Sequence, residues 1–269
     1  MTVLSEKCSC LAFYSAEKQK IDYKSIFSFF LSFAEKNNCR ITHGGVTGNG
    51  YSGSLKSIKT ISKQLENNSY QEINSLSVYS VVSEDKTYND WQFYASVMSS
   101  PQAKNCELVI CLDNSYSFLG SKMMTDTISK INGLFYVDYA IGYDREYTLG
   151  PHYFASGVSQ GLERNSLEAE KIAEWFRAIL NNSFFKRKIL RDVYPVNILN
   201  NEQLQSNLTS KGILGFQNSL TLEKWIIKNN FGILTKITER LWLWEVKSQI
   251  ESISQELCKN KLLLHCKSD

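Results

Sequence analysis

The chain has 269 residues, of which 43% are hydrophobic and 21% are charged. This composition is that of an ordinary globular protein, and it excludes a disordered chain. The net charge of +3 forms no concentrated basic stripe, so we expect no nucleic acid among the partners.

The first quarter of the chain alternates strands and helices. Residues 10–15 (CLAFYS) predict a strand, and residues 23–38 predict a helix because their apolar side chains recur at helical spacing. Residues 39–43 (CRITH) predict a short second strand. Residues 54–68 predict a second helix with one apolar face.

Three strands follow, over 73–82, 91–98 and 107–114. The turns between them leave no room for crossover helices, so we expect antiparallel pairing. Residues 122–133 predict a helix that ends at Gly133, the residue type that a left-handed C-terminal cap prefers.

The clearest strand pattern covers 134–144, where large apolar side chains alternate and Asp138 lies on the more polar face. Residues 145–166 are too rich in Gly and Tyr for a helix, and the length of this stretch suggests a functional loop. Asn165 then predicts the N-cap, in a capping box, of an amphipathic helix over 168–182.

The last third predicts shorter elements. We expect a short helix near 201–207 and a helix over 221–230 that is capped by Thr221. A strand pair or one long strand over 233–246 and an amphipathic helix over 247–260 follow.

This order of elements predicts an α+β fold with mainly antiparallel sheets and flanking helices. We expect two associated halves, 1–120 and 121–269, with one continuous globular unit as the alternative.

The sequence shows neither a membrane span nor an export signal, and its cysteines form no redox motif. It has no run of about 18 uncharged apolar residues and no signal-like start. Its seven cysteines form no C-x-x-C pair, which favours reduced thiols in a cytoplasmic protein. A zinc site from Cys8, Cys10, His265 and Cys266 would need the two ends of the chain to meet, and we expect no bound metal.

One glycine-rich stretch matches a nucleotide-binding motif in its letters, because Gly48, Gly50 and Gly53 spell G-x-G-x-x-G. A dinucleotide site also needs a buried strand directly before the first glycine and an acidic residue about 20 positions later. Neither is present. We therefore interpret the stretch as a surface turn and expect no cofactor, unless a ligand orders Gly44 to Gly53.

Two further groups of residues have both a functional and a structural interpretation. His152 with Asp144 and Glu146 would suit a hydrolase that uses the 144–161 loop, but a structural histidine is the more common case. Basic residues with aromatic neighbours suggest nucleic-acid binding, but Asp192 interrupts them, so we interpret them as a solvated helix face. They are Lys186, Arg187, Lys188 and Arg191.

Two surfaces are candidates for binding a protein. Arg240, Trp242 and Trp244 alternate along one strand, and Trp and Arg dominate binding hot spots. The alternative is that both tryptophans fill the core. The net-acidic middle of the chain contributes Asp138, Asp144 and Glu146 to a second surface, where charge would set the association rate.

From about Asp138 onward, several segments resemble bacterial toxin-immunity-type proteins. These segments are YVDYAIGYDREYTLGPHYFASG, RDVYPVNILN, LEKWI, GILTKI and LWLWEV. The resemblance covers roughly the C-terminal half. It implies an α+β protein that sequesters a toxin and has neither a cofactor nor catalytic residues.

The function that we predict is therefore a cytosolic protein-binding module, an immunity or antitoxin-type inhibitor whose partner is another protein. The alternatives are a hydrolase-type enzyme and a defence- or effector-related protein.

Overall fold

The computed structural model describes residues 6–67, 73–81, 91–99, 105–113, 119, 122–211 and 217–266. Their strands form an 11-stranded sheet in the order β12-β13-β9-β8-β1-β7-β6-β5-β2-β3, with β4 paired to β2, and a separate β10-β11 hairpin. The strands are β1 (Lys7–Ser15), β2 (His43–Gly48), β3 (Tyr51–Ser52), β4 (Lys56–Ser57), β5 (Ile73–Val81), β6 (Trp91–Met98), β7 (Cys106–Asp113), β8 (Tyr139–Glu146), β9 (Val196–Asn200), β10 (Asn207–Lys211), β11 (Gln217–Thr221), β12 (Ile233–Lys236) and β13 (Leu241–Glu245).

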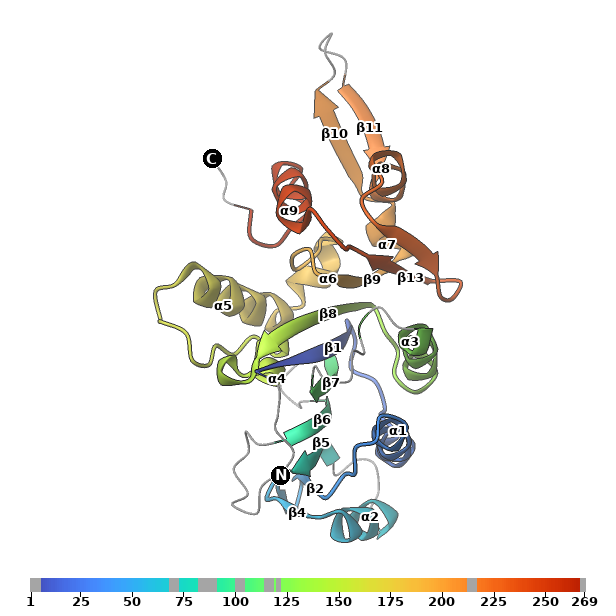
Figure 1. Ribbon diagram of the computed structural model, residues 1–269, viewed down its shortest axis with the longest axis vertical. Coiled ribbons are helices and arrows are strands. Elements are labelled where there is room, and N and C mark those ends of the chain that lie inside the picture. Colours follow the sequence, from blue (N-terminus) through green and yellow to red (C-terminus); the bar gives the residue numbers. More distant parts are fainter. Residues whose placement is uncertain are drawn as a thin grey trace.

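Helices cover both faces of the long sheet. In Figure 1 the sheet follows the long axis of the molecule, with α1 to α3 on one side, α4 and α5 on the other, and the β10-β11 hairpin projecting at the upper end. The helices are α1 (Tyr23–Lys36), α2 (Ile58–Asn67), α3 (Lys122–Leu134), the 3-10 turn η2 (Tyr147–Leu149), α4 (Pro151–Ala155), α5 (Leu167–Leu180), α6 (Ser183–Arg187), α7 (Asn201–Leu204), α8 (Leu222–Asn229) and α9 (Ile250–Lys259).

The first strand lies in the middle of the sheet, where β1 pairs with β7 on one side and with β8 on the other. Successive side chains of a strand point to opposite faces. Leu11 and Phe13 therefore belong to the core under α1, α2 and α3, whereas Ala12 and Tyr14 belong to the core under α4, α5, α6, α8 and α9. β1 is therefore buried on both faces and contributes side chains to both cores.

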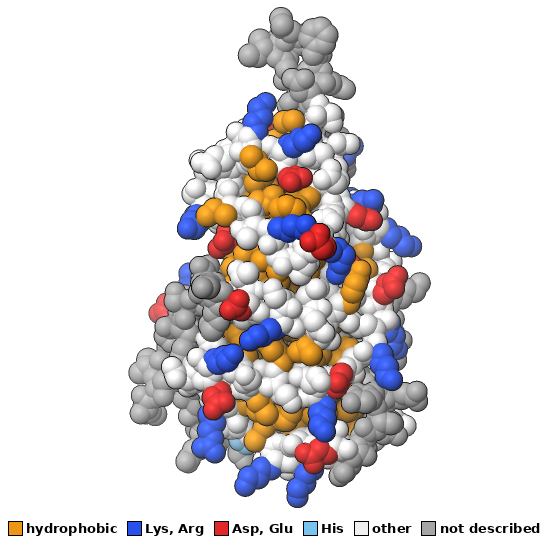
Figure 2. Space-filling view, turned by 90° about the vertical axis from the view of Figure 1, so that its right-hand side faces the viewer, with side chains coloured by type: hydrophobic (Ala, Val, Ile, Leu, Met, Phe, Trp, Pro, Cys, Tyr) orange, Lys and Arg blue, Asp and Glu red, His pale blue; other side chains and the backbone are white. Residues whose placement is uncertain are grey.

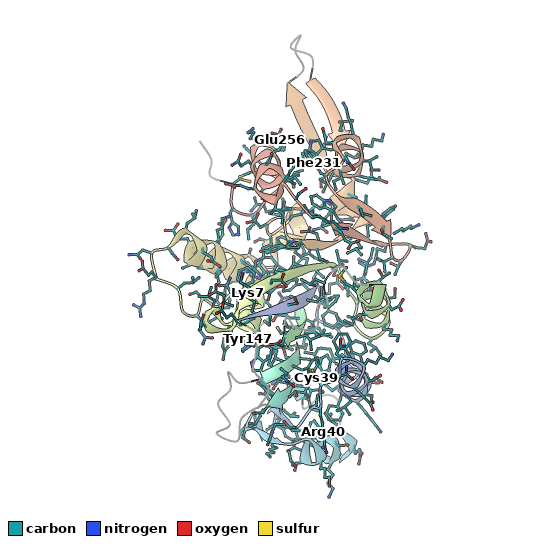
Figure 3. All side chains as sticks on the ribbon, in the orientation of Figure 1. Lys7, Cys39, Arg40, Tyr147, Phe231 and Glu256 are labelled. Atoms are coloured by element: carbon teal, nitrogen blue, oxygen red, sulfur yellow. The ribbon has the colours of Figure 1, made fainter. Side chains whose placement is uncertain are left out.

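Figure 3 shows the side chains that fill the two spaces between the sheet and its helices. It also places Tyr147 near Lys7, where the Tyr147 N–H donates to the Glu6 carbonyl at 3.2 Å. The start of β1 is thus attached to the segment that follows β8.

The prediction of an α+β fold with mainly antiparallel strands and flanking helices is confirmed. The sheet is continuous across the expected boundary near residue 120, because β7 and β8 lie on either side of it and both pair with β1. The division into halves 1–120 and 121–269 stays a prediction. In the described part of the chain, we find no helix of the length and apolar character that a membrane crossing requires.

Several local predictions are confirmed. Residues 91–98 form β6 with the expected bounds, and residues 233–246 form the strand pair β12 and β13. The Thr221 side chain caps α8 by accepting a hydrogen bond from the Lys224 N–H.

Other local predictions are wrong. The strand expected at 39–43 begins only at His43 and continues through the glycines to Gly48. Gly133 lies within α3 and has no left-handed backbone, so it does not cap that helix. The N-cap of α5 is Ser166 rather than Asn165, because the Ser166 hydroxyl accepts a 3.2 Å hydrogen bond from the Ala169 N–H. A serine oxygen serves this role as well as an asparagine oxygen does.

Candidate partner-binding surface

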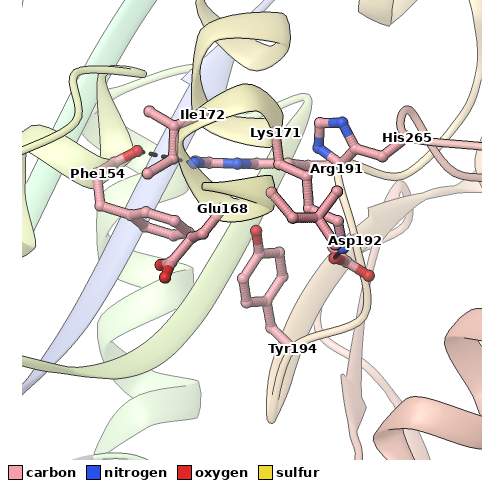
Figure 4. Close-up of a pocket in the computed structure, with 9 residues that line it drawn as sticks. Phe154, Glu168, Lys171, Ile172, Arg191, Asp192, Tyr194 and His265 are labelled. Carbon is pink, nitrogen blue, oxygen red and sulfur yellow. Dashed lines mark hydrogen bonds and ion pairs between the residues drawn. The ribbon is translucent and has the colours of Figure 1, made fainter. Parts of the chain in front are cut away.

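A pocket of about 350 Å³ opens beside α5 (Figure 4). Its volume is near the lower end of the range for small-molecule sites, about 300–1,000 Å³. Its walls come from α4, α5, the segment before β9 and the chain that follows α9. The lining residues are Phe154, Leu167, Glu168, Lys171, Ile172, Arg191, Asp192, Tyr194 and His265.

Arg191 forms part of the floor of this pocket, and only 1% of the residue is exposed. Its Nη2 donates to the Phe154 carbonyl at 2.8 Å, and its Nη1 donates to the Ala155 carbonyl at 3.4 Å. The guanidinium also lies between the rings of Phe154 and Trp175, at 4.0 and 4.8 Å from their centres. The expectation of a solvated basic face is wrong for Arg191, although Lys186, Arg187 and Lys188 are exposed.

Ion pairs surround the mouth of the pocket. Lys171 pairs with Asp192 at 3.1 Å, and Glu168 pairs with Arg145 at 2.6 Å. His265 bonds a carboxylate of α5 through Nδ1, although burial lowers the pKa of this histidine. The rim charges are thus paired with one another, whereas the floor combines the Phe154 ring with the Arg191 guanidinium, which bonds neutral carbonyls.

A second pocket, of about 230 Å³, lies beside the start of β8. Arg240 Nη1 pairs with Asp138 Oδ1 at 3.1 Å, and the guanidinium lies 3.9 Å from the centre of the Tyr136 ring. Asp138 Oδ2 accepts a 2.7 Å hydrogen bond from the Ala16 N–H, and burial raises the pKa of this carboxyl. The Tyr136 residue is 52% exposed, so an aromatic ring and a fixed guanidinium face the solvent together.

Trp242 lies next to this pocket. Its Nε1 donates to Asn201 Oδ1 at 2.9 Å, and Asn201 lines the pocket. We call the set Tyr136, Asp138, Arg240 and Trp242 the Tyr136 surface. Three of its members are predicted partner-binding residues, and the structure brings them together although Asp138 and Arg240 are 102 positions apart in sequence.

The other predicted partner-binding residues lie elsewhere. Asp144 and Glu146 are exposed on β8, and Asp144 accepts a 2.6 Å hydrogen bond from the Ser9 hydroxyl. Trp244 is fully buried, and its Nε1 donates to the Phe231 carbonyl at 2.7 Å. This corrects the expectation that Trp244 lies on an exposed edge, because β13 lies between β12 and β9 and the sheet ends at β12.

The residues of the hydrolase alternative do not converge. His152 belongs to α4, which covers the face of the sheet that bears Tyr143; the Tyr143 ring contacts Phe154 of α4. Because side chains alternate along a strand, Asp144 and Glu146 of β8 point to the face opposite to that of Tyr143. The His152 ring instead contacts Tyr94 and Tyr153, and burial lowers its pKa to about 4.

The glycine-rich stretch forms a hairpin of β2 and β3. A Cβ on Gly45 would lie 2.8 Å from the Gly53 carbonyl oxygen, and a Cβ on Gly44 would lie 2.7 Å from that of Ser77. Gly50 has φ +82° in the turn. The glycines thus permit close packing of backbones. The surface turn is confirmed only around Gly50, and β4 separates the stretch from α2.

The residues of the zinc alternative also lie apart, since Cys8 and Cys10 do not gather with His265 and Cys266. Cys8 and Cys10 are on β1, whereas His265 and Cys266 follow α9, where the Cys258 thiol contacts the His265 carbonyl at 3.9 Å.

On the face of the molecule in Figure 2, basic side chains are interspersed with acidic ones. This distribution differs from the basic stripe that nucleic-acid binding requires.

Comparison with known proteins adds one likeness. No protein-family model matches the chain, and no curated protein sequence is significantly similar to it. A solved structure, the "Pseudomonas aeruginosa T6SS protein PA0821", superposes with a TM-score of 0.56 at 12% sequence identity. The match covers 97% of this chain and 72% of that protein. The two proteins therefore share an overall fold.

Sequence reasoning missed Tyr136 and the pocket beside α5. The alternation over 134–144 does place Tyr136 on the same face as Asp138, and this signal could have added Tyr136 to the candidates. The pocket combines α4, α5, residues 191–194 and His265. No pattern within any one of these segments indicates that they meet.

Proposed function

We propose that the chain is a protein-binding module of the immunity type, an inhibitor that sequesters a toxin. The observation that carries this proposal is the fold match to a T6SS protein over 97% of the chain. A secretion-system context suits a toxin and its inhibitor. The resemblance of the C-terminal half to toxin-immunity-type proteins supports the same function.

The contact that we propose is centred on the Tyr136 surface. Tyr, Trp and Arg are enriched among the few residues that dominate binding energies, and such residues cluster beside pockets. Here Arg240 is held by Asp138 and by the Tyr136 ring before any partner arrives. A fixed side chain loses less conformational entropy on binding, so this arrangement favours affinity.

The exposed carboxylates of Asp144 and Glu146 complete the proposal. They lie at the other end of β8 from Asp138, and charges outside a contact raise the association rate more than the affinity. A toxin with a basic face would therefore be attracted first by Asp144 and Glu146 and retained by the Tyr136 surface. We place the protein in the cytosol, where its seven free thiols stay reduced.

Co-expression tests this function. Each gene that flanks this one in the native genome is expressed alone and together with this chain, and growth is measured. We expect one flanking product to arrest growth and this chain to restore it. The two purified proteins should then form a complex in size-exclusion chromatography. If no flanking product is toxic, or if its toxicity is unchanged by this chain, the immunity function is excluded.

Substitutions then locate the contact. Tyr136→Ala should weaken the complex at least about 30-fold, which corresponds to about 2 kcal/mol. Tyr153→Ala is the matched control, because Tyr153 is 42% exposed on α4, away from the Tyr136 surface. Titration calorimetry measures both. Equal effects of the two substitutions would contradict the proposed location.

A further inference from the structure

Three cysteines meet in the interior of the sheet. Cys8, Cys10 and Cys111 are each 0% exposed, and their sulfur atoms all lie within 4.8 Å of one another. The Cys8 and Cys10 sulfurs are 3.5 Å apart, and the Cys10 and Cys111 sulfurs are 2.8 Å apart. Carbon atoms pack at about 3.5–4.0 Å and sulfur is larger, so the second contact is closer than ordinary packing gives.

The register of the sheet produces this cluster. Cys8 and Cys10 are two positions apart on β1 and so point to the same face. Cys111 of β7 is the direct partner of Cys10 across the strand pair. All three belong to the core under α4 and α5. They come from the two best-covered strands, so the ligands are held in place by the fold.

We propose that Cys8, Cys10 and Cys111 form a three-coordinate sulfur site, of two thiolates and one thiol, for a soft metal ion, copper(I). This inference is independent of the proposed binding function.

One sulfur–sulfur distance is near that of a metal site, and another must lengthen on binding. With metal–sulfur bonds of about 2.3 Å, three sulfurs around one ion are separated by roughly 3.8–4.0 Å. The 3.5 Å separation is close to this value, and the 2.8 Å separation would open by about 1 Å, a movement that side-chain rotation supplies.

The number of donors selects the ion. In the described residues, no fourth His, Cys, Asp or Glu ligand atom joins the three sulfurs within 4.8 Å. Structural zinc takes four ligands, whereas thiolates select soft ions such as copper(I). Asp113, which is the cross-strand partner of Cys8, is 3% exposed, and its carboxylate accepts a hydrogen bond from the Tyr147 hydroxyl. A buried carboxylate beside the site favours an incoming cation.

Binding releases protons and involves no change of oxidation state when the metal is supplied as copper(I). Two thiols that become thiolates release two protons to solvent, and the third sulfur binds as a neutral thiol. The site then carries one negative charge. This small charge limits the penalty of burial.

The test is anaerobic titration of the reduced, metal-free chain with copper(I) in competition with a chromophoric chelator. The Cys258 and Cys266 thiols also lie within hydrogen-bond reach of each other, so this pair is first removed by Cys258→Ala and Cys266→Ala. We expect one copper(I) per chain and at least a 100-fold loss of affinity in Cys111→Ala. Cys106→Ala is the matched control, because Cys106 is buried on the same strand but belongs to the other core. Its affinity should be unchanged.

X-ray absorption of the loaded chain gives a result that no folding defect of a variant affects. We expect three sulfur neighbours at about 2.3 Å. Binding of less than one copper(I) per chain, equal losses in Cys111→Ala and Cys106→Ala, or nitrogen and oxygen neighbours would overturn the site. Retention of zinc(II) without copper(I) would overturn the choice of ion.

Discussion

The Arg191 guanidinium lies 4.0 Å from the centre of the Phe154 ring and donates a 2.8 Å hydrogen bond to the Phe154 carbonyl. The neighbouring Ala155 carbonyl accepts hydrogen bonds from Trp175 Nε1 and from the Tyr14 hydroxyl. These donors gather at the C-terminal end of α4, where the helix dipole favours positive charge. They attach a helix of only five residues to the sheet and to α5.

Replacement of Arg191 should therefore destabilise the protein. We expect Arg191→Met to lower the free energy of unfolding by about 3 kcal/mol. Hydrogen bonds from a charged donor contribute about 1.5–3 kcal/mol each, and the relieved burial of the guanidinium offsets part of this loss. Urea unfolding measures the change. Arg187→Met serves as the control because Arg187 is exposed, and a comparable loss there would contradict the assigned role of Arg191.

The buried Glu107 makes stability fall as pH rises. Burial raises the pKa of Glu107 to about 7, although the hydrogen bond from Ser156 and the charge of Arg191 act to lower it. Between its ordinary value of 4.5 and about 7, the folded state holds a proton that the unfolded state has released. As pH rises across this window, the free energy of unfolding falls by at most about 3 kcal/mol, and Glu107→Gln should remove this fall. Urea unfolding at pH 4.5 and pH 8 checks the difference, and an unaltered slope would refute it.

His152 has the opposite effect. Burial lowers the pKa of His152 from 6.5 to about 4, so between these values the unfolded state binds a proton that the folded state does not. Stability from this group is complete above pH 6.5 and is lost as pH falls towards 4. His152→Phe keeps an aromatic ring beside Tyr94 and should remove the acid loss. Thermal unfolding at pH 4.5 and pH 6.5 measures it.

These two groups nearly cancel in the native protein, because their windows overlap and their signs are opposite. In Glu107→Gln, where Glu107 no longer opposes His152, stability should rise with pH between pH 4.5 and pH 6.5. In His152→Phe it should fall with pH. Slopes of the same sign in both variants would exclude this account.

The two tryptophans of β13 should respond differently to substitution. Trp244 is fully buried, so Trp244→Ala should cost about 3–5 kcal/mol of stability. Trp242 is half-buried, and Trp242→Ala removes mainly its hydrogen bond to Asn201 and part of its packing, about 1 kcal/mol. Denaturant unfolding compares them. A folded Trp242→Ala variant that binds the toxin with native affinity would remove Trp242 from the Tyr136 surface.

Much of the fold could be predicted because local patterns carry it. The alternation over 91–98 and the helical spacing around α5 indicate most of the buried side chains, although Tyr94 is also buried and Phe176 is 41% exposed. The glycine-rich stretch could not be interpreted in this way. The need for glycine at Gly45 comes from the Gly53 backbone, which reaches it only after the hairpin has formed.

The candidate surface was predictable only in its parts. Residue type singles out Asp138, Arg240 and Trp242, but their proximity depends on β9, which lies between β8 and β13. The hydrophobic periodicity of the sequence does not indicate this strand order. The alternation along β13 also places Trp244 on one face of the strand, but it does not indicate that the segment after α8 covers this face.

The central position of β1 affects how the protein is made. Residues 7–15 leave the ribosome before the strands that pair with them, because Cys111 lies 101 positions after Cys10 and Asp144 lies 135 positions after Ser9. The sheet cannot close until both have been synthesised, and closing such long loops slows folding. Until then, an apolar strand with two unpaired edges is exposed in the nascent chain, and such a strand is a site of aggregation.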